Sequence, residues 1–170
     1  STEDKTIDIL ASNNITMADG TSIQSNDGNI SLEATTGIVT TEIVTVNNLV
    51  DADVLIKAGD KIVDLDENSL ITADALILNA GNGIGSSLNH LNTSINTLSA
   101  KADVNTSDTT DDNDIFVTNT QALTVDTITI DINRVDSTAT AETDASGITQ
   151  EDIATSDNGS VVITATNITL

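Results

Sequence analysis

The sequence has no cysteine, no proline, no tryptophan and no tyrosine, and it contains a single phenylalanine and a single histidine. A disulfide framework is therefore excluded. At 170 residues the chain is long enough for one domain with a core, which must be built from Ile, Val, Leu and Ala. Abundant Asp, Asn, Ser and Thr favour turns and strands, so we expect almost no helix.

Positive charge is also scarce, because five Lys and Arg residues stand against 27 Asp and Glu residues, which gives a formal net charge of −22. We expect no nucleic-acid partner, since phosphates would meet a surface of like charge. No apolar run approaches the ~18 residues that span a bilayer, so we expect no membrane insertion. The lack of cysteine and of a leader segment agrees with a secreted bacterial protein whose signal was removed, or with a segment of a longer chain. We therefore expect an extracellular or cell-surface location in a bacterium.

What the sequence does contain is a repeated pentad with the pattern apolar, any, apolar, any, Ala. It occurs as IDILA, ISLEA, VLIKA and LILNA, which begin 23, 24 and 22 residues apart. Further along, NTLSA and IFVTN continue the alternation at spacings of about 19 to 20 residues, and VVITA begins 46 residues after IFVTN, which we interpret as two further turns. Short strands that recur at such a period indicate a parallel β-solenoid, in which each coil buries its inward row against its neighbours. We predict an all-β fold in which residues 1–170 form a single β-solenoid domain of about eight coils with 19–24 residues each.

An antiparallel β-sandwich would also show alternating strands, but the recurrence of one pentad every ~22 residues argues against it. The solenoid predicts that Ile56 and Leu78 point inward on successive coils and that Thr129 points outward. In LTVDTITIDINRV, residues 123–135, the alternation loses step after Val125. A bend at that point would keep both halves of the run inside, so we expect Leu123, Val125, Ile128, Ile130 and Ile132 to line the core.

The stretch AGNGIGSSLN, residues 80–89, places three glycines directly after a strand. We expect positive φ angles at Gly81, Gly83 and Gly85, which would turn a tight corner and leave Ile84 pointing inward. A phosphate-binding loop is not predicted, since the stretch lacks the lysine of that motif and no helix follows.

Residues 73–100, ADALILNAGNGIGSSLNHLNTSINTLSA, resemble the recurring segment of filamentous-haemagglutinin-like exoproteins, which are large bacterial adhesins. The shared features are an apolar strand, AGNGIG, the LNHL stretch and a strand that ends in LSA. His90 stands where that family often has proline. The resemblance implies a right-handed parallel β-helix at a cell surface, with extension or adhesion as its role.

Acidic clusters are the candidate metal ligands, and no other cofactor is expected. Asp64, Asp66 and Asn68 have the alternating spacing of oxygen ligands in a calcium loop, but Ser69 and Ala75 replace its Gly and closing Glu. A second group of acids concentrates charge in a polar stretch, with carboxylates at Asp111, Asp112 and Asp114. Either group could bind Ca²⁺ weakly, and a solvated loop is the alternative.

No catalytic residue is predicted, and we expect the protein not to be an enzyme. His90 is the only histidine and has no identified partner, so we expect a solvated turn residue. Sugar-cleaving β-helix enzymes need a base such as the lone Arg134 or paired carboxylates, but sugars usually stack on aromatic rings that this chain lacks. Thr-x-Thr pairs, which can form flat ice-binding ladders, begin at 118, 127, 138 and 164 and share no coil period.

The function class that remains is structural. We expect a component of an extracellular filament or adhesin stalk that associates end to end, because the strand-like runs near both termini lack a strong guard against edge pairing. The alternative is an adhesive module that recognises a cell-surface ligand on one face of the solenoid. Such a module should carry one aromatic or charged patch, whereas the acids here are dispersed along the chain.

Overall fold

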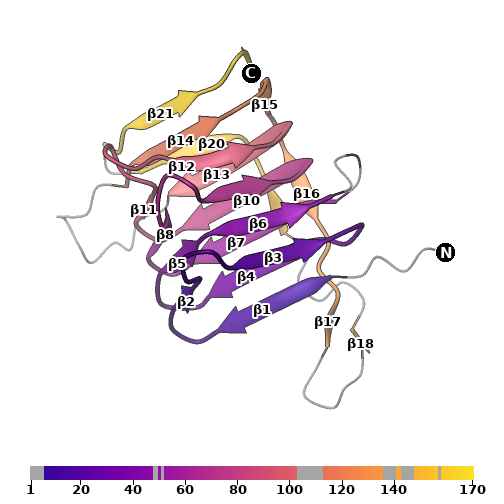
Figure 1. Cartoon of the computed structure of the whole chain (residues 1–170). Helices are drawn as coiled ribbons and strands as arrows, with labels where there is room; N and C mark the ends of the chain where they lie inside the picture. The colour runs from indigo at the N-terminus through magenta and orange to yellow at the C-terminus, as the bar shows by residue number, and fades with distance from the viewer. Residues whose placement is uncertain are drawn as a thin grey trace.

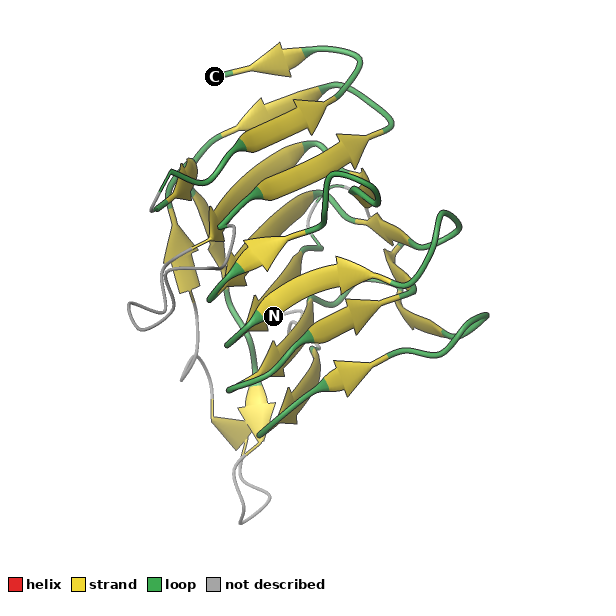
Figure 2. Cartoon of the chain, turned by 90° about the vertical axis from the view of Figure 1, so that its left-hand side faces the viewer, coloured by secondary structure: helices red, strands yellow, loops and turns green. Residues whose placement is uncertain are grey.

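The strands of the chain wind into a solenoid of about five turns (Figure 1). The computed structural model describes residues 6–47, 50, 52–102, 113–135, 141–142, 148–156 and 158–170. Every regular element in these ranges is a β-strand, and the described residues contain no helix that could cross a membrane (Figure 2). The prediction of an all-β solenoid is therefore confirmed.

Two parallel sheets, called A and B, form the walls of the solenoid. Each of the first four turns contributes one strand to sheet A and then two strands to sheet B. Sheet A contains β1 (Ile7–Ala11), β4 (Ile30–Ala34), β7 (Val54–Ala58), β10 (Ala75–Ala80), β13 (Thr97–Ala102), β15 (Leu123–Val125), β20 (Ile153–Thr155) and β22 (Ile168–Thr169). Sheet B contains β2 (Ile15–Thr16), β3 (Ser22–Ser25), β5 (Val39–Thr41), β6 (Ile43–Val46), β8 (Lys61–Asp64), β9 (Leu70–Thr72), β11 (Gly83–Ile84), β12 (Leu91–Ser94), β14 (Ile115–Asn119) and β21 (Val161–Thr164).

The repeated pentads stack in register as sheet A. Ile9 pairs with Leu32, which pairs with Ile56, which pairs with Leu78. Each pentad ends in an alanine that stacks on the alanine of the next turn. A fixed pentad at a nearly fixed period therefore becomes a column of like side chains, because parallel strands place equivalent residues next to each other.

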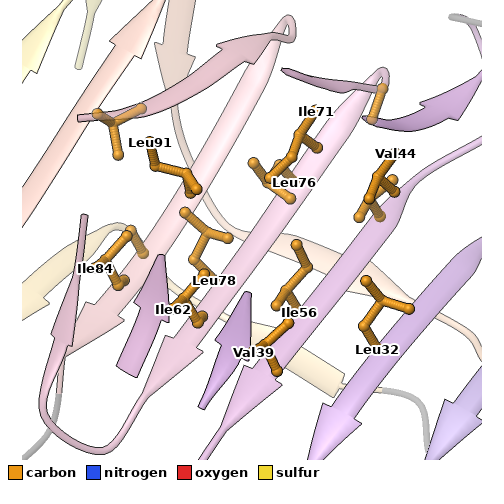
Figure 3. Close-up of a cluster of buried hydrophobic side chains, with 14 of the residues drawn as sticks. Leu32, Val39, Val44, Ile56, Ile62, Ile71, Leu76, Leu78, Ile84 and Leu91 are labelled. Carbon is orange, nitrogen blue, oxygen red and sulfur yellow. The ribbon is translucent and has the colours of Figure 1, made fainter. Parts of the chain in front are cut away.

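The core lies between the two sheets and consists of aliphatic side chains (Figure 3). Ile56 and Leu78 are fully buried in it, as the alternation predicted. Sheet B contributes the facing side chains, among them Ile62 and Ile71. Removing one such side chain from water stabilises the fold by about 1.5–3 kcal/mol, so stacked aliphatic columns can form a core without aromatic residues.

Two of the later pentads lie in sheet B instead of sheet A. The IFVTN stretch is β14 and the VVITA stretch is β21, and these strands pair with each other through Ile115–Val161 and Val117–Ile163. The sequence cannot distinguish the sheets, because alternation with a period of two is the same for any half-buried strand. β14 also joins the two halves of sheet B, since it pairs with both β11 and β12.

After β13, the next strand position of sheet A is divided between two short strands, β15 and β20, because a segment outside the solenoid lies between them in the sequence. β13 pairs with β15 through its first half and with β20 through its second half. Residues 126–152 connect these two pieces, and we call their described part (126–135, 141–142 and 148–152) the strap. The strap contains two antiparallel pairs, formed by β16 (Ile128–Ile130) with β19 (Ile148–Gln150) and by β17 (Arg134–Val135) with β18 (Ala141–Glu142).

The strap corrects two predictions. Leu123 faces the main core, but Ile128, Ile130 and Ile132 form a second cluster with Leu55 and Ile77 on the outer face of sheet A. The expected bend that would keep the whole run inside is therefore wrong. The expected eight coils are also wrong. β14 and β21 pair directly, so the residues between them form one turn with an insertion and not two turns.

In the glycine-rich corner, the reason why glycine is needed differs from one position to the next. Gly85 adopts a positive φ of 65°, as predicted, whereas Gly81 and Gly83 do not have positive φ. At Gly81 the reason is close approach, because a Cβ there would overlap the carbonyl oxygen of Gly59 in the turn below. Ile84 is fully buried, as predicted.

Many acids lie at corners, where they accept hydrogen bonds from the next turn. The Asp53 carboxylate accepts from the backbone nitrogen of Ala75 at 2.9 Å. The Asp74 carboxylate accepts from the Asn96 amide at 2.8 Å, and the Asp60 carboxylate accepts from an asparagine amide at 2.7 Å. Carboxylates at the corners therefore help to hold adjacent turns together, because charge-assisted bonds are stronger than neutral ones.

Candidate functional site

The C-terminal end of the solenoid is an open apolar hollow. Its volume is about 610 Å³, and six of its seven lining residues are aliphatic. The lining residues are Val125, Asp152, Ile153, Val161, Ile163, Ile168 and Leu170. They come from or lie next to the last described strands of both sheets, so the hollow continues the core at this end.

Strand edges border this hollow. Among the described strands, β20 pairs only with β13, β21 only with β14 and β22 only with β15, so each of the three has one free side. The side chains there are exposed, with Val161 and Ile168 at 45% and Leu170 at 95% of their full exposure. Apolar side chains and unpaired backbone groups at one place are the features by which a sheet edge accepts another strand.

The N-terminal end has a matching edge. β1 is the first strand of sheet A and pairs only with β4 in the described part of the chain. Ile7 and Ile9 are only partly buried, and Leu10 is 55% exposed. The two ends of the stack therefore both present aliphatic side chains on a parallel strand edge, and they lie at opposite ends of the molecule (Figure 1).

The first acidic candidate, Asp64, lies at the end of β8 and is 5% exposed. Its Oδ1 accepts a hydrogen bond from Asn89 Nδ2 at 2.6 Å. Its Oδ2 accepts from the side chain of Asn92 at 3.2 Å and from the backbone nitrogen of Asn92 at 3.3 Å. Amide groups of the next turn therefore surround this carboxylate.

A second buried acid, Glu42, lies next to this network. The pKa of Asp64 is raised to about 6, first because the carboxyl group is buried and also because Asp66 and Glu42 are negative, while backbone hydrogen bonds act in the opposite direction. Glu42 is 2% exposed, and its Oε2 accepts from Ser69 Oγ at 2.7 Å. The sequence interpretation missed Glu42, although a single acid between two runs of β-branched residues is a signal for an inward bend.

Asp66 and Asn68 form hydrogen bonds within the turn that follows β8. The Asp66 Oδ1 accepts from the backbone nitrogen of Asn68 at 2.7 Å, and Ser69 Oγ accepts from the backbone nitrogens of Leu65 and Asp66. In the described part of the chain, no group of three or more His, Cys, Asp or Glu residues has an arrangement that could hold a metal ion. Weak Ca²⁺ binding at this turn stays a prediction.

The second acidic candidate is only partly within the described residues. Asp111 and Asp112 lie outside them. Asp114 accepts a hydrogen bond from the backbone nitrogen of Ser160 in the next turn. It also lines a smaller hollow of about 150 Å³, together with Lys61 and Phe116 and next to the glycine-rich corner.

His90 lies directly before β12 and is partly buried. Its Nδ1 is 3.0 Å from the Thr118 hydroxyl, and its ring lies 5.4 Å from the Phe116 ring. His90 lies in the loop before β12, but its side chain packs against neighbours, which differs from the solvated turn position that we expected.

The first residues of two Thr-x-Thr pairs lie in register on adjacent strands, contrary to the expectation from sequence spacing. Thr118 of β14 pairs with Thr164 of β21, because the strap accounts for the extra residues between them. Thr129 is exposed on the strap, where its hydroxyl lies 2.8 Å from that of Thr149. The pair that begins at position 138 lies outside the described residues.

Comparison with protein-family models, with curated proteins and with solved structures found no match. The resemblance of residues 73–100 to filamentous-haemagglutinin-like exoproteins therefore stays a hypothesis, whereas the β-solenoid itself is established.

Proposed function

We propose that this chain is a structural unit of an extracellular bacterial filament or adhesin stalk, built by continuous end-to-end stacking of its coils. The open apolar hollow at the C-terminal end carries the proposal, because it continues the core and is bordered by strand edges with a free side. The occupant that fits best is the N-terminal coil of a second copy. Such a contact would remove aliphatic surface from water and complete the backbone pairing at both edges.

The register of the columns supports this occupant. Ile7 belongs to the same sheet A column as Val125, and Ile9 belongs to the same column as Ile153. β22 already covers β15, so the column of Val125 does not end at the free edge, whereas the column of Ile153 does. A second copy laid on β20 would therefore continue the Ile153 column with Ile9, a side chain of the same kind. The contact joins two different surfaces of the same chain, so it would repeat without closing and give a filament.

Charge at the junction supports it as well. Residues 158–170 contain no charged side chain, although the whole chain has a formal net charge of −22. Asp8 in the first coil forms an ion pair with Arg134 at 2.7 Å. The last strands therefore add no charge at the proposed junction, and Asp152 is the one charged residue among those that line the hollow. The resemblance of residues 73–100 to cell-surface exoproteins supports the extracellular location.

The test uses two variants that each block one end. Ile163→Lys places a charge in the C-terminal hollow, and Ile9→Lys places one on the N-terminal edge. We expect wild-type protein to form threads and oligomers that grow with concentration, as measured by electron microscopy and sedimentation velocity. Each variant alone should stay monomeric, whereas an equimolar mixture should form a dimer through the two unblocked ends.

Thr164→Lys is the matched control, since it places the same charge on the same strand but on an exposed residue. This control should assemble like the wild type. Wild-type protein that stays monomeric at high concentration, or a mixture of the blocked variants that gives no dimer, would overturn the proposal.

A further inference from the structure

The strap runs across the outer face of sheet A and contacts its strands from β13 back to β1. Near its base, Ser99 Oγ of β13 donates to the carbonyl oxygen of Asp152 at 2.9 Å. Gln150 donates to the carbonyl oxygen of Leu78 in β10 at 3.0 Å and accepts from the Asn79 amide at 2.9 Å. These bonds fix the strap to the C-terminal half of the stack.

The middle of the strap is held by apolar packing. Ile128, Ile130 and Ile132 form a cluster with Leu55 of β7 and Ile77 of β10. Ile77 and Ile130 are fully buried although they lie outside the main core. The cluster therefore makes this contact strong enough to persist, because each buried aliphatic side chain contributes about 1.5–3 kcal/mol.

The far end of the strap is held by charge on the first two turns. Arg134 Nε is 2.7 Å from Asp8 Oδ2 of β1, and Arg134 Nη2 is 3.1 Å from Glu33 Oε2 of β4. The backbone nitrogen of Asn133 donates to Thr6 Oγ1 at 3.1 Å. Burial raises the pKa of Glu33, but hydrogen bonds from Lys57 and Arg134 outweigh this effect, and the net shift is downward.

These contacts reach five successive strands of sheet A, namely β1, β4, β7, β10 and β13. In a simple solenoid each turn contacts only its neighbours, so a terminal turn can open without affecting distant turns. Residues at one end of this stack are instead tied directly to a segment whose base lies at the other end. We propose that the strap is a lengthwise brace that couples the stability of the N-terminal turns to that of the C-terminal turns. This inference concerns one molecule and does not depend on the proposed stacking.

Amide hydrogen exchange of the monomeric protein tests the brace, because it reports local opening strand by strand. Stacking is blocked in all samples by Ile163→Lys, so failure of the assembly proposal does not affect the result. In Arg134→Gln we expect amides of β1 and β4 to exchange about tenfold faster or more, while those of β10 and β13 change much less. Asp131→Asn is the matched control, since it changes one charge on an exposed strap residue and should leave the exchange of β1 unchanged.

A second measurement compares two redox forms of one variant, so the hydrogen bond that is lost with Thr6 is absent from both forms. The chain has no cysteine, so Thr6→Cys with Asn133→Cys would create one thiol pair between the first turn and the strap. We expect amides of β1 to exchange at least several-fold more slowly in the oxidised than in the reduced form of this variant. Equal acceleration of all strands in Arg134→Gln, or no difference between oxidised and reduced forms, would overturn the inference.

Discussion

Asn89 Nδ2 donates a hydrogen bond of 2.6 Å to Asp64 Oδ1 across adjacent turns, and this contact fixes a buried carboxylate between Asn89 and Asn92. The pKa of Asp64 is raised from 3.8 to about 6, so the folded state binds a proton more tightly than the unfolded state. Between these two pH values the free energy of unfolding therefore falls as pH rises. The stabilisation by the protonated form is complete below about pH 4 and is lost above about pH 6.

The first prediction tests this linkage with Asp64→Asn, which cannot titrate. The free energy of unfolding of the wild type, minus that of the variant, should decrease as the pH rises from about 4 to about 6 and should level off above that range. Denaturant titrations at four pH values measure it. A difference that does not vary with pH would show that Asp64 titrates normally.

The second prediction concerns the aliphatic columns. Ile56→Ala should reduce the free energy of unfolding by about 2–5 kcal/mol, because the fully buried side chain would leave a cavity between two turns. Replacement of Ile56 or Leu78 by Asp should cost more, since the charge would have no partner in the core. Urea unfolding followed by circular dichroism gives these values.

Thr129 provides the control for the core substitutions. Its side chain is exposed on the strap, and Thr129→Asp should change the free energy of unfolding by only about 0.5–1 kcal/mol. Equal losses at Thr129 and Ile56 would contradict the assignment of inward and outward positions.

The third prediction separates the two roles of glycine. Gly81→Ala should destabilise strongly, because the new Cβ would overlap the backbone of the turn below. Gly20 has a positive φ of 74° and nothing within 4 Å of an added Cβ, so Gly20→Ala should cost only the backbone term of about 1–2 kcal/mol. Thermal unfolding of both variants measures the order, and a larger loss at Gly20 would rule out close stacking as the cause at Gly81.

The fourth prediction concerns salt. The chain has 27 acids and five cations, and stacked turns bring carboxylates near one another. The Debye length falls from about 10 Å at 0.1 M to about 3 Å at 1 M ionic strength, so the melting midpoint should rise with NaCl. Millimolar Ca²⁺ should raise it further if carboxylates bind the ion. A midpoint that is unchanged between low salt with chelator and Ca²⁺ would contradict the prediction.

Much of the fold could be predicted because the pentads are local and regular. The alternation in VLIKA and LILNA placed Ile56 and Leu78 inside, and the period of 22–24 residues predicted which residues stack. For the candidate sites the sequence identified Asp64 as an acid of interest, but it could not show Glu42, Asn89 and Asn92 beside it. Those residues come from other turns, and only the stacking brings them together.

The pentads alone predicted the parallel β-solenoid and the inward row of its first turns, because an aliphatic alternation that recurs at a nearly fixed period brings like side chains into register when the turns stack. The position of the strap, in contrast, depends on tertiary contacts. Ile128, Ile130 and Ile132 alternate equally well for a strand inside the solenoid and for one that packs outside it. The outer position is favoured because the three isoleucines bury Leu55 and Ile77, which lie on the outer face of sheet A. Arg134 adds ion pairs with Asp8 and Glu33 at the far end of the strap.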